Sequence, residues 1–294
     1  MRKLQQRAAG VLETVLAGTA LHQILPQQLQ QLDTPGERGA LQDIVYGSLR
    51  QLGRLDAWLA ALLERPLTDP QLGWLLHPDW WIDKLQVQYP ASWQGILQAS
   101  LLHPPFTLRV NRRHGDVAGT LQRLSEAGLP AHQTGPDAVT LDRAVAVHSL
   151  PGFAEGHVSV QDAGAQWAAR LLDAQPGERV LDACAAPGGK SGHILERADV
   201  DLTALDVDAA RLGRVQDNLE RLRLTATVRA GDAAQPEAWW DGRLFDRILA
   251  DVPCSASGVV RRNPDIKWLR RPGDIAQFAA QQAVMLDALW RLLA

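Results

Sequence analysis

The stretch "DACAAPGGKS", Asp182 to Ser191, decides the fold, because small residues there join a short apolar run to a helix-forming segment. Its ending, Gly-Lys-Ser, suggests a loop that binds a nucleoside triphosphate. Such a loop needs its first glycine five residues before the glycine of Gly-Lys-Ser, and Cys184 occupies that position. The dinucleotide fingerprint G-x-G-x-x-G is absent as well. What remains is a small-residue turn after a strand, where a ligand can approach the backbone closely.

Segments of alternating type surround this turn from Ala165 onward. The apolar runs "RVLDACA", "LTALDVD", "TATVRAGDA" and "DRILADV" have strand character, and stretches with helical periodicity such as "GKSGHILERA" separate or follow them. Strands that alternate with helices are typical of a doubly wound parallel sheet. The sequence therefore predicts an α/β fold for this part of the chain.

The region before the turn has a different organisation. Residues 1 to about 66 show helical spacing, with a break at Leu32–Gly39 and a domain boundary at Arg65–Gly73. A strand, a helix and a second strand follow from Phe106, which indicates a small α+β module. We predict three domains: a helical one over 1–75, a helical linker with the α+β module over 76–150, and the alternating core over 151–294.

Composition restricts the possible environments and partners. The formal net charge is −3, so nucleic-acid contacts would come from local basic patches. No apolar run is long enough for a membrane span, and the amino terminus lacks the apolar core of a secretory signal. Two cysteines and scattered histidines match no metal-binding spacing. We expect a cytoplasmic protein with no metal and no membrane partner.

Acidic residues end three of the predicted strands. Asp206 ends the second strand, Asp232 the third and Asp251 the fourth. A carboxylate at the tip of the second strand can accept hydrogen bonds from the ribose hydroxyls of an adenosine. Each acid alone would be explained as a helix cap or a turn residue. Together with a turn that lacks a phosphate site, they favour S-adenosylmethionine as the ligand.

These residues carry a resemblance to a known family. The stretches "LPGFAEGHVSVQDAGAQ", "DACAAPGGKSGHILE", "LDVD" and "DRILADVPCSASGVVRRNPDIKWLRR" closely resemble the bacterial Sun/Fmu type of 16S ribosomal RNA cytosine-5 methyltransferase, within the Nop2/Sun family. The resemblance implies a NusB-like all-α domain, a small α+β RNA-binding module and a Rossmann-like methyltransferase core. It also implies an S-adenosylmethionine site formed by Cys184, Ala185, Ala186, Pro187, Gly188, Gly189, Lys190, Asp206, Asp232 and Asp251.

The chain departs from the family pattern in two places. The helical region before "HPDWW" looks about half the family's length, and the chain stops at "LWRLLA", before the family's Thr-Cys-Ser motif with its nucleophilic cysteine. Two hypotheses follow. The protein methylates carbon 5 of a cytosine in small-subunit ribosomal RNA through a cysteine adduct, or this chain binds cofactor and RNA without turnover. An open-edged last strand would also make the isolated chain marginally stable.

Methylation of carbon 5 of a cytosine needs a thiolate and an acid next to the target nucleobase. Attack of a thiolate at carbon 6 turns the ring into an enamine whose carbon 5 accepts the methyl group. Asp251 would hydrogen-bond ring nitrogen 3 as charge builds there. By the resemblance, Cys254 assists release of the product, although it is also a candidate nucleophile, as in DNA cytosine-5 methyltransferases, or a buried small apolar residue. Cys184 has a packing role within the turn.

A basic segment suggests where RNA binds. "VVRRNPDIKWLRR" holds five cations against Asp265, with Trp268 among them, which suits phosphate and base contacts but also a solvated loop. A weaker signal of this kind lies in "LRVNRRH". We expect a monomer whose RNA-binding residues are Arg109, Asn111, Arg261, Arg262, Lys267, Arg270 and Arg271.

Overall fold

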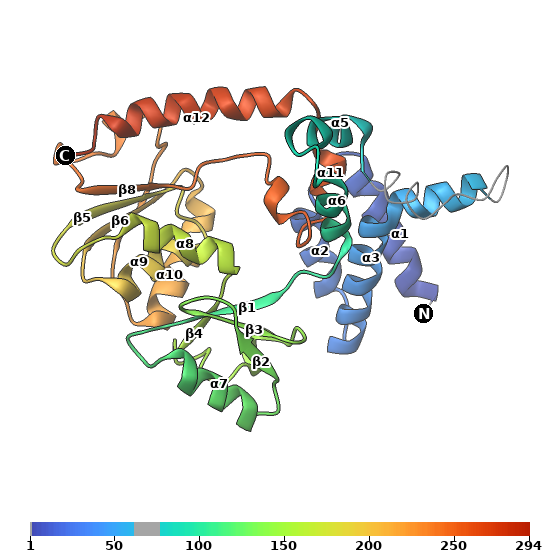
Figure 1. The fold of residues 1–294 in the computed structure, drawn as a ribbon, viewed down its shortest axis with the longest axis horizontal. Coiled ribbons are helices and arrows are strands. Elements are labelled where there is room, and N and C mark those ends of the chain that lie inside the picture. The colour runs from blue at the N-terminus through green and yellow to red at the C-terminus, as the bar shows by residue number, and fades with distance from the viewer. Residues whose placement is uncertain (1, 62–76) are drawn as a thin grey trace. The chain divides into compact units, whose positions relative to one another are not determined.

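The structure is a computed structural model that describes residues 2–61 and 77–294, and these form two compact units (Figure 1). The helical unit contains the described residues up to Pro104 together with Ser255–Gln277, and the α/β unit contains Pro105–Cys254 and Phe278–Ala294. The expected domain boundary at Arg65–Gly73 lies outside the described residues. The grouping of Ser255–Gln277 with the helical unit was not expected from the sequence.

The helical unit begins with three helices, α1 (Arg2–Leu16), α2 (Leu21–Gln30) and α3 (Pro35–Ala61). The expected break between the second and third helices is present. Thr34 and Glu37 form a capping box there, since the Thr34 hydroxyl accepts from Glu37 N at 3.2 Å and the Glu37 carboxylate accepts from Thr34 N at 3.4 Å. Two shorter helices follow, α5 (Asp79–Gln88) and α6 (Trp93–Leu101).

The core of the helical unit follows the helical repeat. Leu4, Ala8, Val11 and Val15 recur on one face of α1 and are buried against apolar residues of α2 and α3, among them Leu41, Val45 and Leu49. This all-α region is confirmed for the described residues, while its likeness to NusB stays a prediction.

The α+β module forms the first sheet of the α/β unit. Its elements are β1 (Phe106–Val110), α7 (Val117–Glu126), β2 (Ala131–Gln133), β3 (Ala138–Leu141) and β4 (Val158–Val160). The strands pair antiparallel in the order β2-β3-β1-β4, and we call this the module sheet. The sequence predicted β1, α7 and β3. It missed the two three-residue strands, and β4 carries the module past the boundary expected at residue 150.

The second sheet is the parallel sheet expected from the sequence. Its strands β5 (Arg179–Ala183), β6 (Asp201–Asp206), β7 (Thr227–Ala230) and β8 (Arg247–Ala250) run in the order β7-β6-β5-β8. The helices α8 (Ala163–Leu172), α9 (Gly189–Arg197) and α10 (Ala209–Leu222) connect or precede them, and α12 (Asp274–Trp290) follows. The predicted Rossmann-like α/β class is confirmed.

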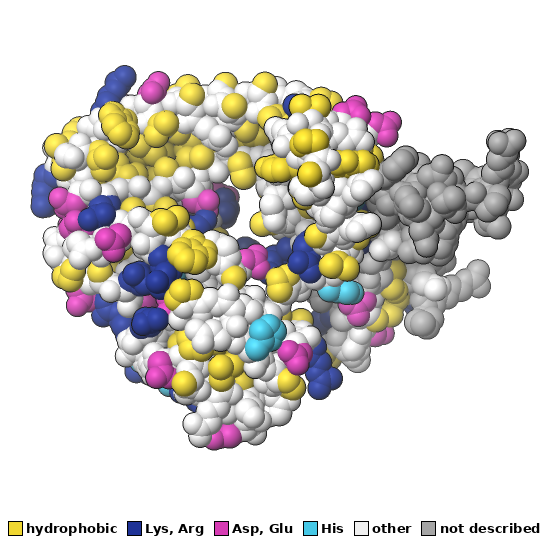
Figure 2. Space-filling view, in the orientation of Figure 1, with side chains coloured by type: hydrophobic (Ala, Val, Ile, Leu, Met, Phe, Trp, Pro, Cys, Tyr) yellow, Lys and Arg dark blue, Asp and Glu magenta, His cyan; other side chains and the backbone are white. Residues whose placement is uncertain are grey.

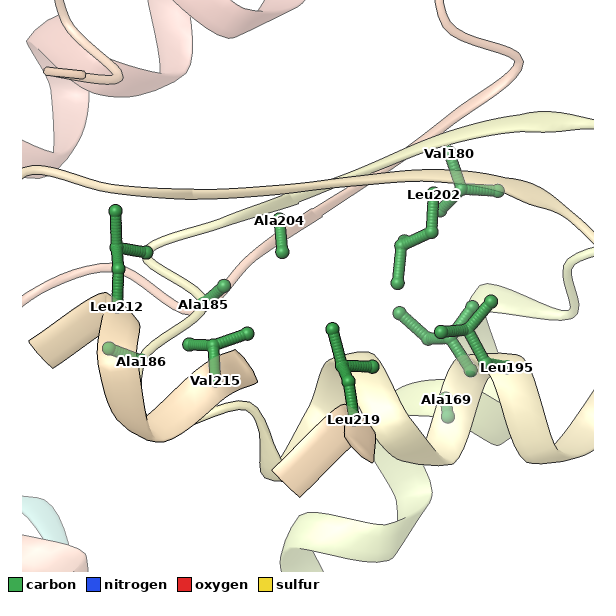
Figure 3. Packing of buried hydrophobic residues seen from close by; sticks show 11 residues of the cluster. Ala169, Val180, Ala185, Ala186, Leu195, Leu202, Ala204, Leu212, Val215 and Leu219 are labelled. Atoms are coloured by element: carbon green, nitrogen blue, oxygen red, sulfur yellow. The ribbon is translucent and has the colours of Figure 1, made fainter. Parts of the chain in front are cut away.

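The two faces of the parallel sheet are covered by different helices, because successive side chains of a strand point to opposite faces. Val180 and Leu202 face the cluster built with α8, α9 and α10 (Figure 3). Leu181 and Leu205 face the opposite side, where Met285 of α12 packs. At the sheet edge beside β8, Phe245 forms a parallel bridge with Leu293.

Two absences apply to the described part of the chain. None of its helices is both long and apolar enough to cross a membrane. It also contains no group of three or more His, Cys, Asp or Glu side chains arranged to hold a metal ion.

Candidate active site

The turn from Cys184 to Gly188, here called the glycine turn, joins β5 to α9. Cys184 and Gly188 both have left-handed backbone conformations, with φ of 64° and 95°. A Cβ atom on Gly188 would lie 3.0 Å from the Cα of Val215 in α10. Both the conformation and this close approach require glycine at position 188. The turn therefore lies tightly against α10 at the carboxyl end of β5.

Asp206, the last residue of β6, supports the glycine turn. Its Oδ2 accepts a hydrogen bond from Ala186 N at 2.9 Å, and its Oδ1 accepts one from Asp208 N at 3.0 Å. Arg211 adds a bond from its guanidinium to the Ala186 carbonyl oxygen at 2.8 Å. Each carboxylate oxygen can accept a second hydrogen bond. The carboxyl group of Asp206 is thus held in place and keeps capacity for a hydroxyl ligand.

Two further acids lie at the same carboxyl end of the sheet. Asp232 follows β7, and its carboxylate accepts from Ala234 N at 2.9 Å. The neighbouring Gly231 allows close packing, since a Cβ there would lie 2.7 Å from the Trp239 ring. Asp251 directly follows β8 and forms an ion pair with Lys190. The parallel pairing of the strands therefore gathers Asp206, Asp232 and Asp251 beside the glycine turn, as the sequence analysis expected.

Burial shifts the pKa of two groups in this region. Asp182 in β5 is completely buried, and burial raises the pKa of its carboxyl to about 7, although the Ser191 hydroxyl donates to it at 2.6 Å. Burial, followed by the negative charge of Asp206, raises the pKa of the Cys184 thiol to about 11. A thiolate at Cys184 is therefore disfavoured, which agrees with a packing role.

The other cysteine, Cys254, has a contrasting environment. It is exposed in the loop after β8, and neither cysteine forms a disulfide. Gln282 of α12 donates to the carbonyl oxygen of Pro253 at 2.8 Å. This hydrogen bond holds Pro253, the residue before Cys254, in place. Cys254 is thus the accessible thiol of this chain, placed shortly after β8 and Asp251.

Comparison with known families agrees with this geometry. Residues 169–294 match the family described as 16S rRNA methyltransferase RsmB/F, and residues 77–148 match the ferredoxin-like domain of RsmF/B-like methyltransferases. Two separate regions of this chain thus match domains of RsmB/F methyltransferases. The resemblance to the Sun/Fmu type is therefore confirmed.

Curated relatives extend beyond the matched region. The ribosomal RNA small subunit methyltransferases B of Salmonella arizonae and Salmonella typhi are each 50% identical to this chain over 257 residues. Each match covers 86% of this chain and 59% of the relative. The chain therefore spans 59% of the length of the curated relatives it matches.

Solved structures share the fold. The crystal structure of PH0851 superposes with a TM-score of 0.79 at 20% identity, covering 96% of this chain and 82% of its own. A methyltransferase homologue from Pyrococcus horikoshii gives a TM-score of 0.61 at 27% identity, covering 74% of each chain. NSun6 from Pyrococcus horikoshii, solved with SFG, gives 0.65 at 18% identity, over 74% of this chain and 80% of its own.

In this chain, two expected RNA-binding residues are internal. Arg109 is 1% exposed, and its guanidinium pairs with Glu196. Asn111 is also 1% exposed, and its amide donates to the Gly156 carbonyl oxygen at 2.9 Å and accepts from Arg113 N at 3.0 Å. Because both side chains are buried and hydrogen-bonded inside the protein, the expectation that they contact RNA is corrected.

The basic segment also differs from expectation at one position. Lys267 is 1% exposed, and its ammonium donates to the Arg50 carbonyl oxygen at 3.1 Å within the helical unit. Burial lowers its pKa to about 8. Trp268 beside it donates to the Leu49 carbonyl oxygen at 3.1 Å. Lys267 and Trp268 therefore anchor the segment to the helices, and Lys267 is removed from the expected RNA-binding set.

The remaining basic residues are at least partly accessible. Arg271 is exposed, and Arg261, Arg262 and Arg270 are partly exposed. Arg261 donates to the His103 carbonyl oxygen and Arg270 to the Ser255 carbonyl oxygen. These contacts orient Arg261 and Arg270, and both residues stay partly exposed.

Sequence analysis missed the residues that support the site from a distance. Asn218 of α10 donates to the Pro187 carbonyl oxygen at 2.9 Å, Arg109 of β1 donates to the Gly189 carbonyl oxygen at 2.7 Å, and Arg211 contacts Ala186 as described. The motif around the glycine turn does not include these residues. The helical periodicity places Asn218 and Arg211 on α10, and the segment "LRVNRRH" indicated Arg109 as an RNA contact, not as a support of the site.

Proposed function

We propose that this chain binds S-adenosylmethionine at the glycine turn and acts in methylation of carbon 5 of a cytosine in small-subunit ribosomal RNA. The proposal rests on one observation. The glycine turn lies together with Asp206, Asp232 and Asp251 at the common carboxyl end of the parallel strands. The match of residues 169–294 to the 16S rRNA methyltransferase RsmB/F family supports the same function. The finer elements, carbon 5 and a cysteine adduct, rest on the resemblance and on the chemistry below.

The residues present fit an adenosine cofactor without phosphates. The glycine turn offers a close backbone surface, and Asp206 has acceptor capacity for ribose hydroxyls. Lys190, an ammonium close to the turn, is already ion-paired with Asp251. When bound, the cofactor supplies an electrophilic methyl group. Cys184 through Lys190, with Asp206, Asp232 and Asp251, are the residues proposed to hold it.

The side chains near β8 suit the base. Asp251 is 55% exposed and follows the strand tip, where it can hydrogen-bond the ring of a cytosine. Cys254 is exposed close by along the chain, and it is proposed either to attack carbon 6 itself or, where another thiol attacks, to assist removal of the carbon 5 proton and release of that thiol. Arg261, Arg262, Arg270 and Arg271 are proposed as RNA contacts, through their charge for phosphate groups.

A second candidate function is binding of cofactor and RNA without turnover. It is favoured by the cysteine inventory, because Cys184 has a pKa raised to about 11 and leaves Cys254 as the accessible thiol. The two candidates differ in whether this chain forms a covalent adduct. The domain limits 1–75, 76–150 and 151–294, a monomeric state and a cytoplasmic location remain predictions.

Cofactor binding is tested by calorimetry with S-adenosylmethionine. We expect the chain to bind it, and Asp206→Ala to weaken binding by about 10- to 100-fold, because a hydrogen-bonded charged acceptor is lost. Asp201→Ala is the matched control, since Asp201 is an exposed aspartate at the opposite end of the same strand. Equal affinity of the wild-type and Asp206→Ala chains would contradict the site.

Turnover is tested with small-subunit ribosomal RNA and labelled cofactor. Methylated cytosine would support the enzymatic function, and its loss in Cys254→Ala would support a role for that thiol. A covalent complex with RNA that contains 5-fluorocytidine would identify the attacking cysteine by mass spectrometry. Cofactor binding without methyl transfer or adduct would favour the second candidate.

A further inference from the structure

The buried Arg109 side chain joins the module sheet to α9. Its Nε and Nη2 donate to the two carboxylate oxygens of Glu196, at 2.8 and 2.6 Å. Its Nη1 donates to the carbonyl oxygen of Gly189 at 2.7 Å and to the side-chain oxygen of Gln161 at 2.9 Å. The side chains of Arg109 and Glu196 are only 1% and 2% exposed. One guanidinium therefore contacts the last turn and the first residue of the same helix.

Stability alone does not account for this pair. Burying two charges costs several kcal/mol per ion, and apolar residues of similar volume often replace such pairs without loss of stability. What the pair supplies is direction, because a guanidinium held by both oxygens of a carboxylate has a fixed orientation. That fixed orientation points Nη1 at Gly189.

Gly189 is the residue where the glycine turn becomes α9. Its carbonyl oxygen accepts from Arg109, and the next turn of the helix passes close to the same side chain, since a Cβ on Gly192 would lie 3.5 Å from Arg109 Nη2 and 2.7 Å from Leu222 Cδ1. The start of α9 is thus held between β1 and α10. A shift of Arg109 would move the residue that directly follows the turn.

We propose that Arg109 is a positioning residue that sets the glycine turn in its ligand-binding conformation from the module sheet. Cofactor affinity then depends on the α+β module, although no residue of that module belongs to the proposed cofactor site. The ligand in this inference rests on the proposed function, since S-adenosylmethionine is the molecule assigned to the turn.

Arg113 offers a matched control at the other end of α9. It lies in the same module, and its guanidinium donates to the Leu195 carbonyl oxygen at 2.9 and 2.6 Å and to Asp199 at 2.6 Å. It therefore also connects the module with α9, but far from the glycine turn. If substitutions only loosened the module, variants of Arg109 and Arg113 would lose cofactor affinity equally. If Arg109 positions the turn, only variants of Arg109 would lose it.

The experiment compares the full chain with three variants. Arg109→Met combined with Glu196→Leu removes both charges, so that neither is left buried alone. Arg109→Lys keeps the charge but lacks the fork that contacts Glu196 and Gly189 together. Arg113→Met is the control. Calorimetry gives the S-adenosylmethionine affinity, hydrogen exchange with mass spectrometry gives the protection of residues 184–192, and thermal melting checks folding.

We expect the double variant and Arg109→Lys to bind about tenfold more weakly, the effect of losing a charge-assisted hydrogen bond, and to exchange faster at residues 184–192. Arg113→Met should match the wild type in both. The inference is overturned if the folded double variant keeps wild-type affinity and exchange, or if Arg113→Met shows the same loss. If the double variant does not fold, Arg109→Lys decides by the same criteria. If the wild-type chain binds no cofactor, the proposed function fails, while the exchange of residues 184–192 still tests the positioning role.

Discussion

Asp182 shows how burial changes the chemistry of a single residue in β5. Its carboxyl is enclosed by the sheet, with the Ser191 hydroxyl on Oδ2 and no hydrogen-bond partner for Oδ1 among the described residues. Burial disfavours the charged form, which explains the pKa of about 7. Unlike Asp206, Asp232 and Asp251, this acid lies inside the strand and not at its tip. Asp182 is therefore part of the structure that supports the site.

The raised pKa of Asp182 makes stability depend on pH. Below about pH 4 both folded and unfolded chains hold the proton; between about 4 and 7 only the folded chain holds it. The free energy of unfolding should therefore fall as pH rises through this window, by up to about 1.4 kcal/mol per pH unit, and level off above pH 7.

The measurement is urea unfolding of the wild type and Asp182→Asn between pH 4.5 and 8. Asparagine keeps the shape without the titration, so the difference between the two chains should shift in favour of the variant up to pH 7 and then stay constant. A constant difference over the whole range would show that the Asp182 carboxyl titrates normally.

At the scale of elements, the site depends on contact between the glycine turn and α10. Gly188 lies against the backbone of Val215, and Asn218 and Arg211 of the same helix bind carbonyl oxygens of the turn. The helix thus holds the turn in place from one side, while Asp206 holds it from the strand. This arrangement explains why a loop without a phosphate-binding glycine pattern has a defined shape.

Two glycines of these elements should respond in opposite directions to alanine. Gly188→Ala should destabilise the chain by about 1–3 kcal/mol, because the new Cβ meets Val215 and the left-handed conformation is strained. Gly213→Ala should stabilise it by about 0.5–1 kcal/mol, since Gly213 is exposed within α10 and a Cβ there meets no atom within 4 Å. Chemical denaturation measures both, and a stabilising Gly188→Ala would contradict the described packing.

At the scale of the whole molecule, Ser255–Gln277 belongs to the helical unit although it follows the core strands in sequence. Val260 is buried in a cluster with Trp81, Ile82 and Leu97, and Asp265 accepts from Leu21 N at 3.1 Å. Figure 2 shows Lys and Arg side chains at the surface of the α/β unit as well. The basic segment is thus a structural part of the helical unit as well as a candidate RNA contact.

This arrangement predicts the effect of removing the helices. In a chain that begins at Pro105, the segment 255–277 loses the helices that bury Val260 and Lys267, so it should become sensitive to trypsin. Limited proteolysis with mass spectrometry compares the shortened and full-length chains, and Arg243, in the α/β unit, provides the internal reference site. Cleavage after Lys267 at the same rate in both chains would show that the segment does not depend on residues before 105.

Much of the site follows from local patterns in the sequence. Apolar runs and helical periodicity indicate the parallel sheet, and strands of such a sheet end at one edge, so Asp206, Asp232 and Asp251 could be brought together without coordinates. The glycine turn could be distinguished from a phosphate loop by spacing alone. The short strands β2 and β4 were not predicted, because three residues show too little alternation of apolar and polar side chains to indicate a strand.

Only the tertiary structure decided which polar residues are buried. Arg109 looked like an RNA contact in "LRVNRRH", but its partner Glu196 is 87 positions away, and Lys267 looked like one in the basic segment, but its acceptor on Arg50 is 217 positions away. A charged side chain lies inside a protein only where distant groups satisfy it. Sequence periodicity determined the strands and their tips because these depend on neighbouring residues, whereas the burial of Arg109, Asn111 and Lys267 depended on contacts that only the folded chain creates.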